Sequence, residues 1–203
     1  MSEEKSSIEV LADFAKSTGR KFFCNDNLYN NSLPNRYPKY RSNITIFNNN
    51  KSQSYFISFW GSLGLSDINS CYSGFFLPVT FSKEDFFIIR KRNFLDNFSL
   101  FSRNKSYKTG NMFFDSKVFV EGNFSSKVEQ LIFNQKFQDI VIKVLNIKQT
   151  AKISLNAIKV DFVSELNERV LFSVYDTQQW FLDAKTIEEL FVIIDDFNAI
   201  LDI

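Results

Sequence analysis

The chain has 203 residues, and 44% of them are hydrophobic, which supports a buried core and excludes a disordered chain. It contains no histidine, which excludes a serine or cysteine nucleophile activated by histidine and any histidine metal ligand. The net charge is +1, yet residues 1–120 carry 16 Lys and Arg against 10 Asp and Glu, while residues 121–203 carry 8 against 13. This asymmetry predicts either docking of one half on the other or attraction of an anionic partner to the first half.

A short amphipathic helix is predicted at the N-terminus. Ser6 caps its first turn and Glu9, three residues later, completes a capping box. Leu11 and Phe14 fall on one face of this helix, and Gly19 ends it.

Residues 25–42 are rich in Asn and contain Pro34 and Pro38, so we expect a loop that is too polar to form a strand. Three cations and two tyrosines alternate within it. Arg and Tyr are enriched at protein interfaces, and cations with aromatic rings also suit single-stranded nucleic acid. The predicted partner-binding residues are Arg36, Tyr37, Lys39, Tyr40 and Arg41.

Strand patterns dominate the next segment. Residues 44–47 and 55–60 predict a hairpin, and residues 74–81 and 86–90 predict two further strands. Residues 91–108 are polar and show no clear period, so we expect a mobile connection there.

The segment T-G-N-M-F-F-D-S-K-V-F-V-E-G spans residues 109–122. Gly110 and Asp115 suit a turn before a strand ended by Gly122, with Phe114 and Phe119 as core anchors. The segment resembles the T-G-x-x-x-F-D-x-x-F-x-V pattern of a group of uncharacterised bacterial proteins, with a similar layout over residues 85–201. This resemblance implies a bacterial protein in which a helix, two strands and a C-terminal helix follow; it implies no activity.

A second capping box, formed by Ser126 and Glu129, predicts the start of a middle helix. Apolar residues at spacings of three and four continue its buried face over residues 128–145, with a possible break at Asn134 and Gln135.

Two strands are predicted at residues 153–163 and 170–175, the first half-solvated, with Ser154 on its polar side. The last helix is predicted to start at Thr186, with Glu189 completing its capping box. Its buried stripe comprises Ile187, Leu190, Phe191, Ile194, Phe197 and Leu201.

These elements predict an α+β fold in which an antiparallel sheet packs with an N-terminal, a middle and a C-terminal helix. We divide the chain into a basic, strand-rich half (residues 1–108) and an acidic half (residues 109–203) with the order strand, helix, strand, strand, helix. A single compact domain is the alternative.

No cofactor and no metal are expected. The six glycines form no phosphate-binding motif, and Cys24 and Cys71 are too far apart for a zinc knuckle or a redox pair. Asp161, Glu165 and Glu168 lack the spacing of a calcium loop. The polar N-terminus is not followed by the apolar segment of a secretory signal, so we expect a cytoplasmic protein without a membrane span.

We therefore expect a non-enzymatic bacterial protein of regulatory or immunity type that binds an acidic protein partner. One alternative is nucleic-acid binding by the same loop, extended by Arg90, Lys91 and Arg92. Another is a histidine-free enzyme with a carboxylate site, which requires an Asp or Glu of strongly shifted pKa in a pocket. No catalytic residue is predicted.

Overall fold

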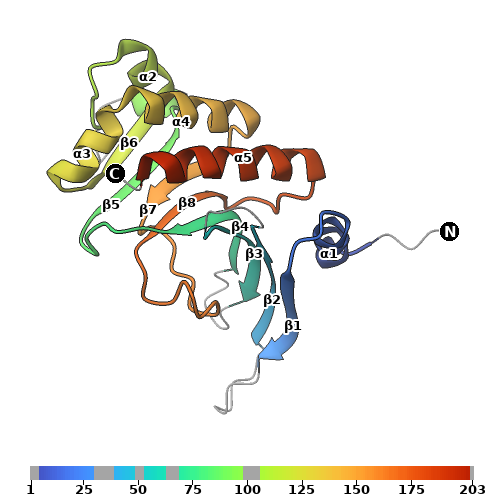
Figure 1. Ribbon diagram of the computed structural model, residues 1–203. Helices are drawn as coiled ribbons and strands as arrows, with labels where there is room; N and C mark the ends of the chain where they lie inside the picture. Colours follow the sequence, from blue (N-terminus) through green and yellow to red (C-terminus); the bar gives the residue numbers. More distant parts are fainter. Residues whose placement is uncertain (1–4, 30–38, 49–52, 63–68, 98–105, 202–203) are drawn as a thin grey trace. The chain divides into compact units, whose positions relative to one another are not determined.

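The computed structural model describes residues 5–29, 39–48, 53–62, 69–97 and 106–201, and confirms the predicted α+β class (Figure 1). The strands are β1 (Phe22–Tyr29), β2 (Lys39–Phe47), β3 (Tyr55–Ser62), β4 (Asn69–Pro78), β5 (Phe86–Lys91), β6 (Val118–Asn123), β7 (Lys152–Leu155) and β8 (Leu171–Asp176). The α-helices are α1 (Ser7–Ser17), α2 (Met112–Lys117), α3 (Ser126–Phe133), α4 (Gln135–Ile147) and α5 (Ala184–Leu201). The strands form an antiparallel sheet in the order β1-β2-β3-β4-β8-β7-β5-β6.

The chain divides into two compact units, each built from two separate stretches of sequence. Unit 1 comprises Met1–Phe75 and Tyr175–Phe191, and unit 2 comprises Phe76–Val174 and Val192–Ile203. The boundary that we placed at residue 108 falls inside unit 2.

Helix α1 has the predicted form. The Ser6 side chain accepts a hydrogen bond from the Glu9 N–H, and the Glu9 carboxylate accepts one from the Ser6 N–H, which completes the capping box. Leu11 and Phe14 are buried, and Gly19 follows the helix with φ +66°, in the left-handed region that glycine favours.

The prediction of a loop over residues 25–42 is wrong at both ends. Residues 25–29 belong to β1 and residues 39–42 to β2, and the two strands pair in antiparallel register from Tyr29 and Lys39 to Phe22 and Ile46. The error arose because β1 lies at the end of the strand order, where its exposed residues Cys24, Asn25 and Asp26 give no alternating apolar pattern.

The next strands occur where the sequence predicted them. β2 and β3 form the expected hairpin, with Ile46 opposite Phe56. β4 and β5 contain most of the residues predicted as strands 74–81 and 86–90. Within the predicted connection 91–108, a short 3-10 helix spans Phe94–Asn97, and residues 98–105 lie outside the described part of the chain.

The predicted turn before β6 is the short helix α2. Asn111 caps it, because its side-chain oxygen accepts hydrogen bonds from the N–H groups of Phe113 and Phe114. The core anchors were predicted correctly: Phe114 and Phe119 are buried. Gly122 does not end the strand but lies within β6, opposite Phe87.

The capping box predicted at Ser126 is absent. The N-cap residue is Ser125, whose hydroxyl and N–H both donate to the carboxylate of Asp85 instead of capping the helix. The break between α3 and α4 is confirmed: Asn134 ends α3, and its side chain accepts hydrogen bonds from the first N–H groups of α4.

Two further expectations need correction. The strand predicted over residues 153–163 ends at Leu155, and Ser154 is fully buried, with its hydroxyl hydrogen-bonded to that of Ser173 (2.8 Å). Helix α5 is capped by Asp183, which accepts hydrogen bonds from both the N–H and the hydroxyl of Thr186. The predicted stripe of α5 is correct, since all six of its residues are buried.

Each unit has its own core of phenylalanine rings. In unit 1 the rings of Phe56, Phe75 and Phe191 are in mutual contact, with centroid distances of 4.7–6.5 Å. In unit 2 Phe172 contacts Phe87, Phe137 and Phe197. Here α4 and the C-terminal part of α5 lie side by side (Figure 1), in agreement with the Phe137–Phe197 contact at 5.5 Å. No helix in the described ranges is both long and apolar enough to cross a membrane.

Candidate functional site

The five predicted partner-binding residues lie at the start of β2 and just before it. Arg36 and Tyr37 are outside the described residues. Lys39, Tyr40 and Arg41 are the first three residues of β2 and are not part of a loop. Arg41 is half-buried, with its guanidinium 5.7 Å from the ring centroid of Phe59.

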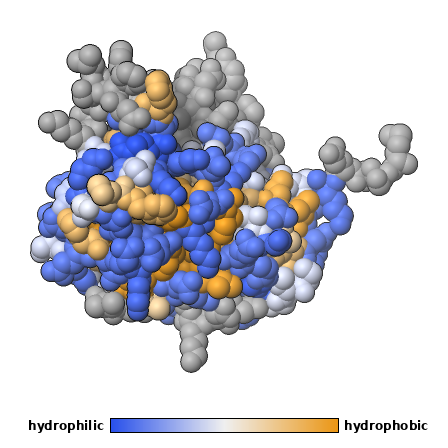
Figure 2. Space-filling model, turned by 90° about the horizontal axis from the view of Figure 1, so that it is seen from above, coloured by the Kyte–Doolittle hydropathy of each residue, from blue (hydrophilic) through white to orange (hydrophobic). Residues whose placement is uncertain are grey.

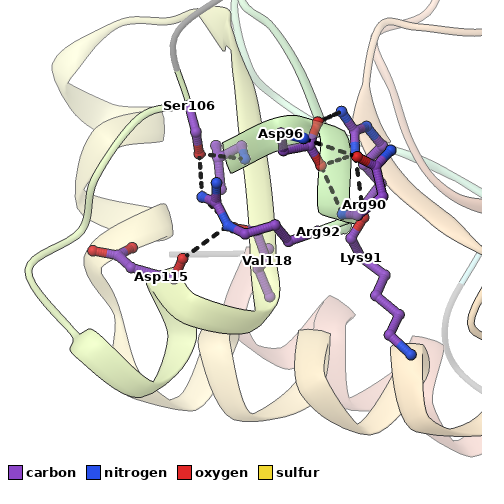
Figure 3. Close-up of polar contacts among 9 residues, drawn as sticks. Arg90, Lys91, Arg92, Asp96, Ser106, Asp115 and Val118 are labelled. Carbon is purple, nitrogen blue, oxygen red and sulfur yellow. Dashed lines mark hydrogen bonds and ion pairs between the residues drawn. The ribbon is translucent and has the colours of Figure 1, made fainter. Parts of the chain in front are cut away.

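Arg90, which was considered as part of a nucleic-acid surface, is held inside unit 2 (Figure 3). Its two terminal nitrogens donate to the two carboxylate oxygens of Asp96, both at 2.7 Å. The Asn93 N–H also donates to Asp96. The hydrogen bonds from Arg90 hold the pKa of Asp96 below its usual value, and those to Asp96 raise the pKa of Arg90.

Arg92 and Lys91 also have internal partners. Arg92 donates to the carbonyl oxygens of Asp115 and Val118 and to the Ser106 hydroxyl, each at 3.1 Å (Figure 3). Lys91 donates to the Gln149 side chain at 2.7 Å. All three cations therefore connect parts of unit 2, and this arrangement adds no support to the nucleic-acid interpretation.

The Arg90–Asp96 pair yields a prediction for acid stability. Asp96→Asn is expected to lower the free energy of unfolding by about 1–3 kcal/mol at neutral pH, because both side chains are more than two-thirds buried and Arg90 loses a charged acceptor. The carboxyl pKa is lower in the folded protein, so this stabilisation is complete above about pH 5 and is lost as the pH falls below 3.8. Denaturant titrations at several pH values measure it.

The exposed Lys5–Asp13 pair provides the control for this experiment. The two side chains are 64% and 49% exposed, so Asp13→Asn is expected to change stability too little to resolve. Equal losses in the two variants would contradict the structural role of Asp96.

Helix α2 is held by polar contacts on both sides of its N-terminus. The carboxylate of Asp115 accepts hydrogen bonds from the N–H groups of Thr109 and Gly110 and from the Thr109 hydroxyl, all near 3 Å. The side-chain amide of Asn111 donates to Gln135 and Gln138 at the start of α4. These contacts explain the Thr, Gly and Asp of the T-G-N-M-F-F-D segment as parts of the fold.

This fixed helix exposes large apolar side chains. Met112 (86% exposed) and Phe113 (59%) are among the most exposed apolar residues described. Figure 2 shows that hydrophobic areas lie between hydrophilic ones on one face of the molecule. Phe133, next to α4, is 46% exposed. The Lys117 ammonium lies 3.9 Å from the Phe113 ring centroid, and Lys108 is exposed just before the helix. We call Lys108, Met112, Phe113 and Lys117, which lie within and just before α2, the α2 surface.

A cavity of about 470 Å³ in unit 2 includes two of the acidic residues weighed as a cation site. Asp161 and Glu168 line it, together with Lys83, Lys159 and Arg169. Glu165 instead accepts a hydrogen bond from the Ser164 hydroxyl. In the described ranges, no three His, Cys, Asp or Glu side chains converge as metal ligands.

Two residues lining this cavity have left-handed backbone, Asn156 (φ +57°) and Glu168 (φ +59°). The conformation of Asn156 has a structural cause. Its side-chain amide donates to the carbonyl oxygens of Ser82 and Asp85, and its side-chain oxygen accepts from the Leu171 N–H. These three hydrogen bonds of its own side chain therefore hold the Asn156 backbone in the left-handed conformation.

A second cavity, of about 500 Å³, lies in unit 1. Three of its lining residues are neighbours on adjacent strands: Asp26 on β1 pairs with Ser42 on β2, and Ser42 pairs with Trp60 on β3. The hydroxyls of Ser58 on β3 and Ser73 on β4 form a buried hydrogen bond, so these two residues lie on neighbouring strands. Two residues further along, Trp60 on β3 and Cys71 on β4 both line the cavity, as expected for antiparallel strands.

The remaining lining residues come from two other segments. Ser6, Ser7 and Ile8 belong to the start of α1, and Gln179, Trp180 and Leu182 to the connection between β8 and α5. Trp180 is fixed, because its indole N–H donates to the Phe59 carbonyl oxygen at 3.1 Å. The pKa of Cys71 is raised, mainly by burial of the thiol.

No motif or local pattern in the sequence indicated this cavity. Its one available signal was that the only two tryptophans of a chain with 25 phenylalanines are Trp60 and Trp180, 120 positions apart. Their proximity depends on the strand order and could not be read from local patterns.

The enzyme alternative requires a carboxyl group of strongly shifted pKa in a pocket. Where the pKa of a described Asp or Glu is shifted, the shift is downward and is caused mainly by hydrogen bonds; these residues are Glu9, Asp13, Asp96, Glu165 and Asp183. None of the five lines either of the two cavities described above.

A comparison of the chain with protein families, curated proteins and solved structures finds no match in any of the three.

Proposed function

We propose that the chain is a non-enzymatic binding protein that recognises an acidic segment of another protein, as a bacterial regulatory or immunity-type protein would. The observation that supports this most directly is the exposure of Met112 and Phe113 on the α2 surface, with Lys117 next to the Phe113 ring. Neighbouring exposed apolar side chains are a feature of interaction sites, and methionine and aromatic residues are enriched in interfaces.

The charges around α2 favour an acidic partner. Lys117 carries its positive charge next to the Phe113 ring, and Lys108 is exposed four residues before Met112. Asp115 and Glu129 are half-buried and accept hydrogen bonds from Thr109 and Gly110 and from the Tyr107 hydroxyl, whereas Lys108 and Lys117 are exposed. A segment with apolar anchors and acidic flanks complements this arrangement.

The residues Arg36 to Arg41 stay a second proposed contact for the same partner. They belong to unit 1, whereas the α2 surface belongs to unit 2. Charge reversal on each surface separately tells which one the partner uses.

The test is site-specific photo-crosslinking in the native host. Phe113 is replaced by p-benzoylphenylalanine, which keeps the aromatic ring, and Val192, 58% exposed on α5, is replaced in the control. We expect one covalent protein adduct from position 113 and none from position 192. Lys117→Glu is expected to reduce this adduct about tenfold, whereas Lys185→Glu, at the start of α5, leaves it unchanged.

The remaining outcomes separate the alternatives. An adduct that disappears after nuclease treatment indicates nucleic acid as the partner. If Lys117→Glu leaves the adduct unchanged but Lys39→Glu and Arg41→Glu abolish it, the partner binds at β2 and not at the α2 surface. Equal adducts from positions 113 and 192 would contradict a specific α2 surface.

A further inference from the structure

We infer that the unit 1 cavity is a binding site for a small, flat aromatic molecule without negative charge, and that an amino group strengthens binding. This site is separate from the α2 surface and does not depend on the function proposed above. Its lining residues come from β1–β4, the start of α1 and the connection before α5.

The size of the cavity suits a small ligand. Its volume is about 500 Å³, within the roughly 300–1,000 Å³ that is usual for small-molecule sites. Ser6, Ser7, Ser42 and Gln179 supply neutral hydrogen-bonding groups around the apolar surface.

The two tryptophans indicate an aromatic ligand. Trp60 and Trp180 are both half-buried, so part of each side chain remains accessible. The hydrogen bond from Trp180 to the Phe59 carbonyl oxygen holds its ring before any ligand arrives, which limits the entropy lost on binding. Indole faces bind flat rings by stacking and bind cations through the ring quadrupole.

The charge of the lining selects against anions. Among the ten described residues that line the cavity, Asp26 is the one acidic residue, and no Lys or Arg is among them. It is exposed and is the register partner of Ser42, which in turn pairs with Trp60. The N–H groups at the N-terminus of α1 would otherwise attract an anion. One of them, the Ser6 N–H, already donates a hydrogen bond to the Glu9 carboxylate.

The experiment uses three probes with the same phenyl ring and similar size: phenethylamine (positive), 2-phenylethanol (neutral) and phenylacetate (negative). The ¹⁵N-labelled chain has two indole N–H signals in its NMR spectrum, one from each tryptophan. We expect phenethylamine to shift both signals in a saturable way and to bind about tenfold more tightly than 2-phenylethanol. Phenylacetate is expected to bind most weakly.

Variants and a chemical readout make the assignment falsifiable. Asp26→Asn is expected to remove the tenfold preference for the amine and to leave the affinity for 2-phenylethanol unchanged. Trp60→Leu is expected to abolish binding of all three probes. In the unaltered protein, phenethylamine is expected to slow alkylation of Cys71 by iodoacetamide, while the exposed Cys24 reacts at an unchanged rate.

Three results would overturn the inference. The first is that none of the probes shifts either indole signal or protects Cys71. The second is that phenylacetate binds as tightly as phenethylamine. The third is that the probes slow Cys24 and Cys71 equally, which would show an effect outside the cavity.

Discussion

Gly122→Ala is expected to destabilise unit 2 by about 3–5 kcal/mol, since it combines backbone strain with a clash inside a paired strand. Gly122 has φ +157° and lies in β6 opposite Phe87. A Cβ atom at this position would lie 2.2 Å from the Phe86 carbonyl oxygen and 2.7 Å from the Phe87 Cα. Both are backbone atoms, so β5 and β6 would have to separate.

Two other glycines provide matched controls. Gly19 (φ +66°) and Gly110 (φ +82°) also have positive φ, but an added Cβ would meet nothing within 4 Å. Alanine at either position is expected to cost about 1–2 kcal/mol, from the left-handed conformation alone. Denaturant unfolding followed by far-ultraviolet circular dichroism compares the three variants, and a loss at Gly122 no larger than at Gly110 would refute the close approach of β5.

Phe172→Ala is expected to lower the free energy of unfolding by about 3–5 kcal/mol, because it removes a ring from the centre of the unit 2 core. Phe172 is fully buried on β8. Its ring centroid lies 4.9 Å from that of Phe197 and 6.3 Å from that of Phe137, so the substitution leaves a cavity between β8, α4 and α5.

Phe94→Ala is the control for this core prediction. The side chain of Phe94 is 74% exposed, and its removal is expected to change stability by less than about 0.5 kcal/mol. Phe172→Leu retains most of the volume and is expected to cost about 1–1.5 kcal/mol. Circular dichroism is the appropriate signal, because it reports on the secondary structure of both units, whereas Trp60 and Trp180 both belong to unit 1. Equal losses for Phe94→Ala and Phe172→Ala would be inconsistent with the core described.

The parts of the fold that could be predicted are those with a strong local period. The faces of α1, α4 and α5 followed the three-and-four spacing, because each of these helices buries one stripe. The hairpin of β2 and β3 was also recognisable. β1 could not be predicted, since the pairing that makes it a strand comes from residues of β2.

Helix caps were harder to predict because several polar residues compete for the same role. Ser125 has the position of a cap, but its hydroxyl donates to Asp85, 40 residues earlier in the chain. At α5 the acceptor for Thr186 is Asp183, and a carboxylate can accept from both the N–H and the hydroxyl. The sequence pattern marks where a helix begins but does not identify which side chain completes it.

The candidate sites depended still more on tertiary structure. The cations Arg90 and Arg92 looked available in the sequence. The partner of Arg90 is Asp96, on the 3-10 helix that follows β5, whereas the Val118 partner of Arg92 is known only once β5 pairs with β6. The tryptophan-lined cavity required the register of β1, β2 and β3, which no local pattern specifies.

The two-part origin of unit 1 has a consequence for biosynthesis. Its first stretch ends at Phe75, and the residues that complete it begin at Tyr175, after roughly 100 residues of unit 2. A ribosome adds about 5–20 residues per second, so β3 and β4 wait roughly 5–20 s for the segment that contains Trp180 and Phe181. During this interval the Phe59 carbonyl lacks the indole N–H of Trp180, and the Ser73 hydroxyl lacks the N–H of Phe181. The nascent chain is therefore expected to need protection by chaperones until residues 175–191 have left the ribosome.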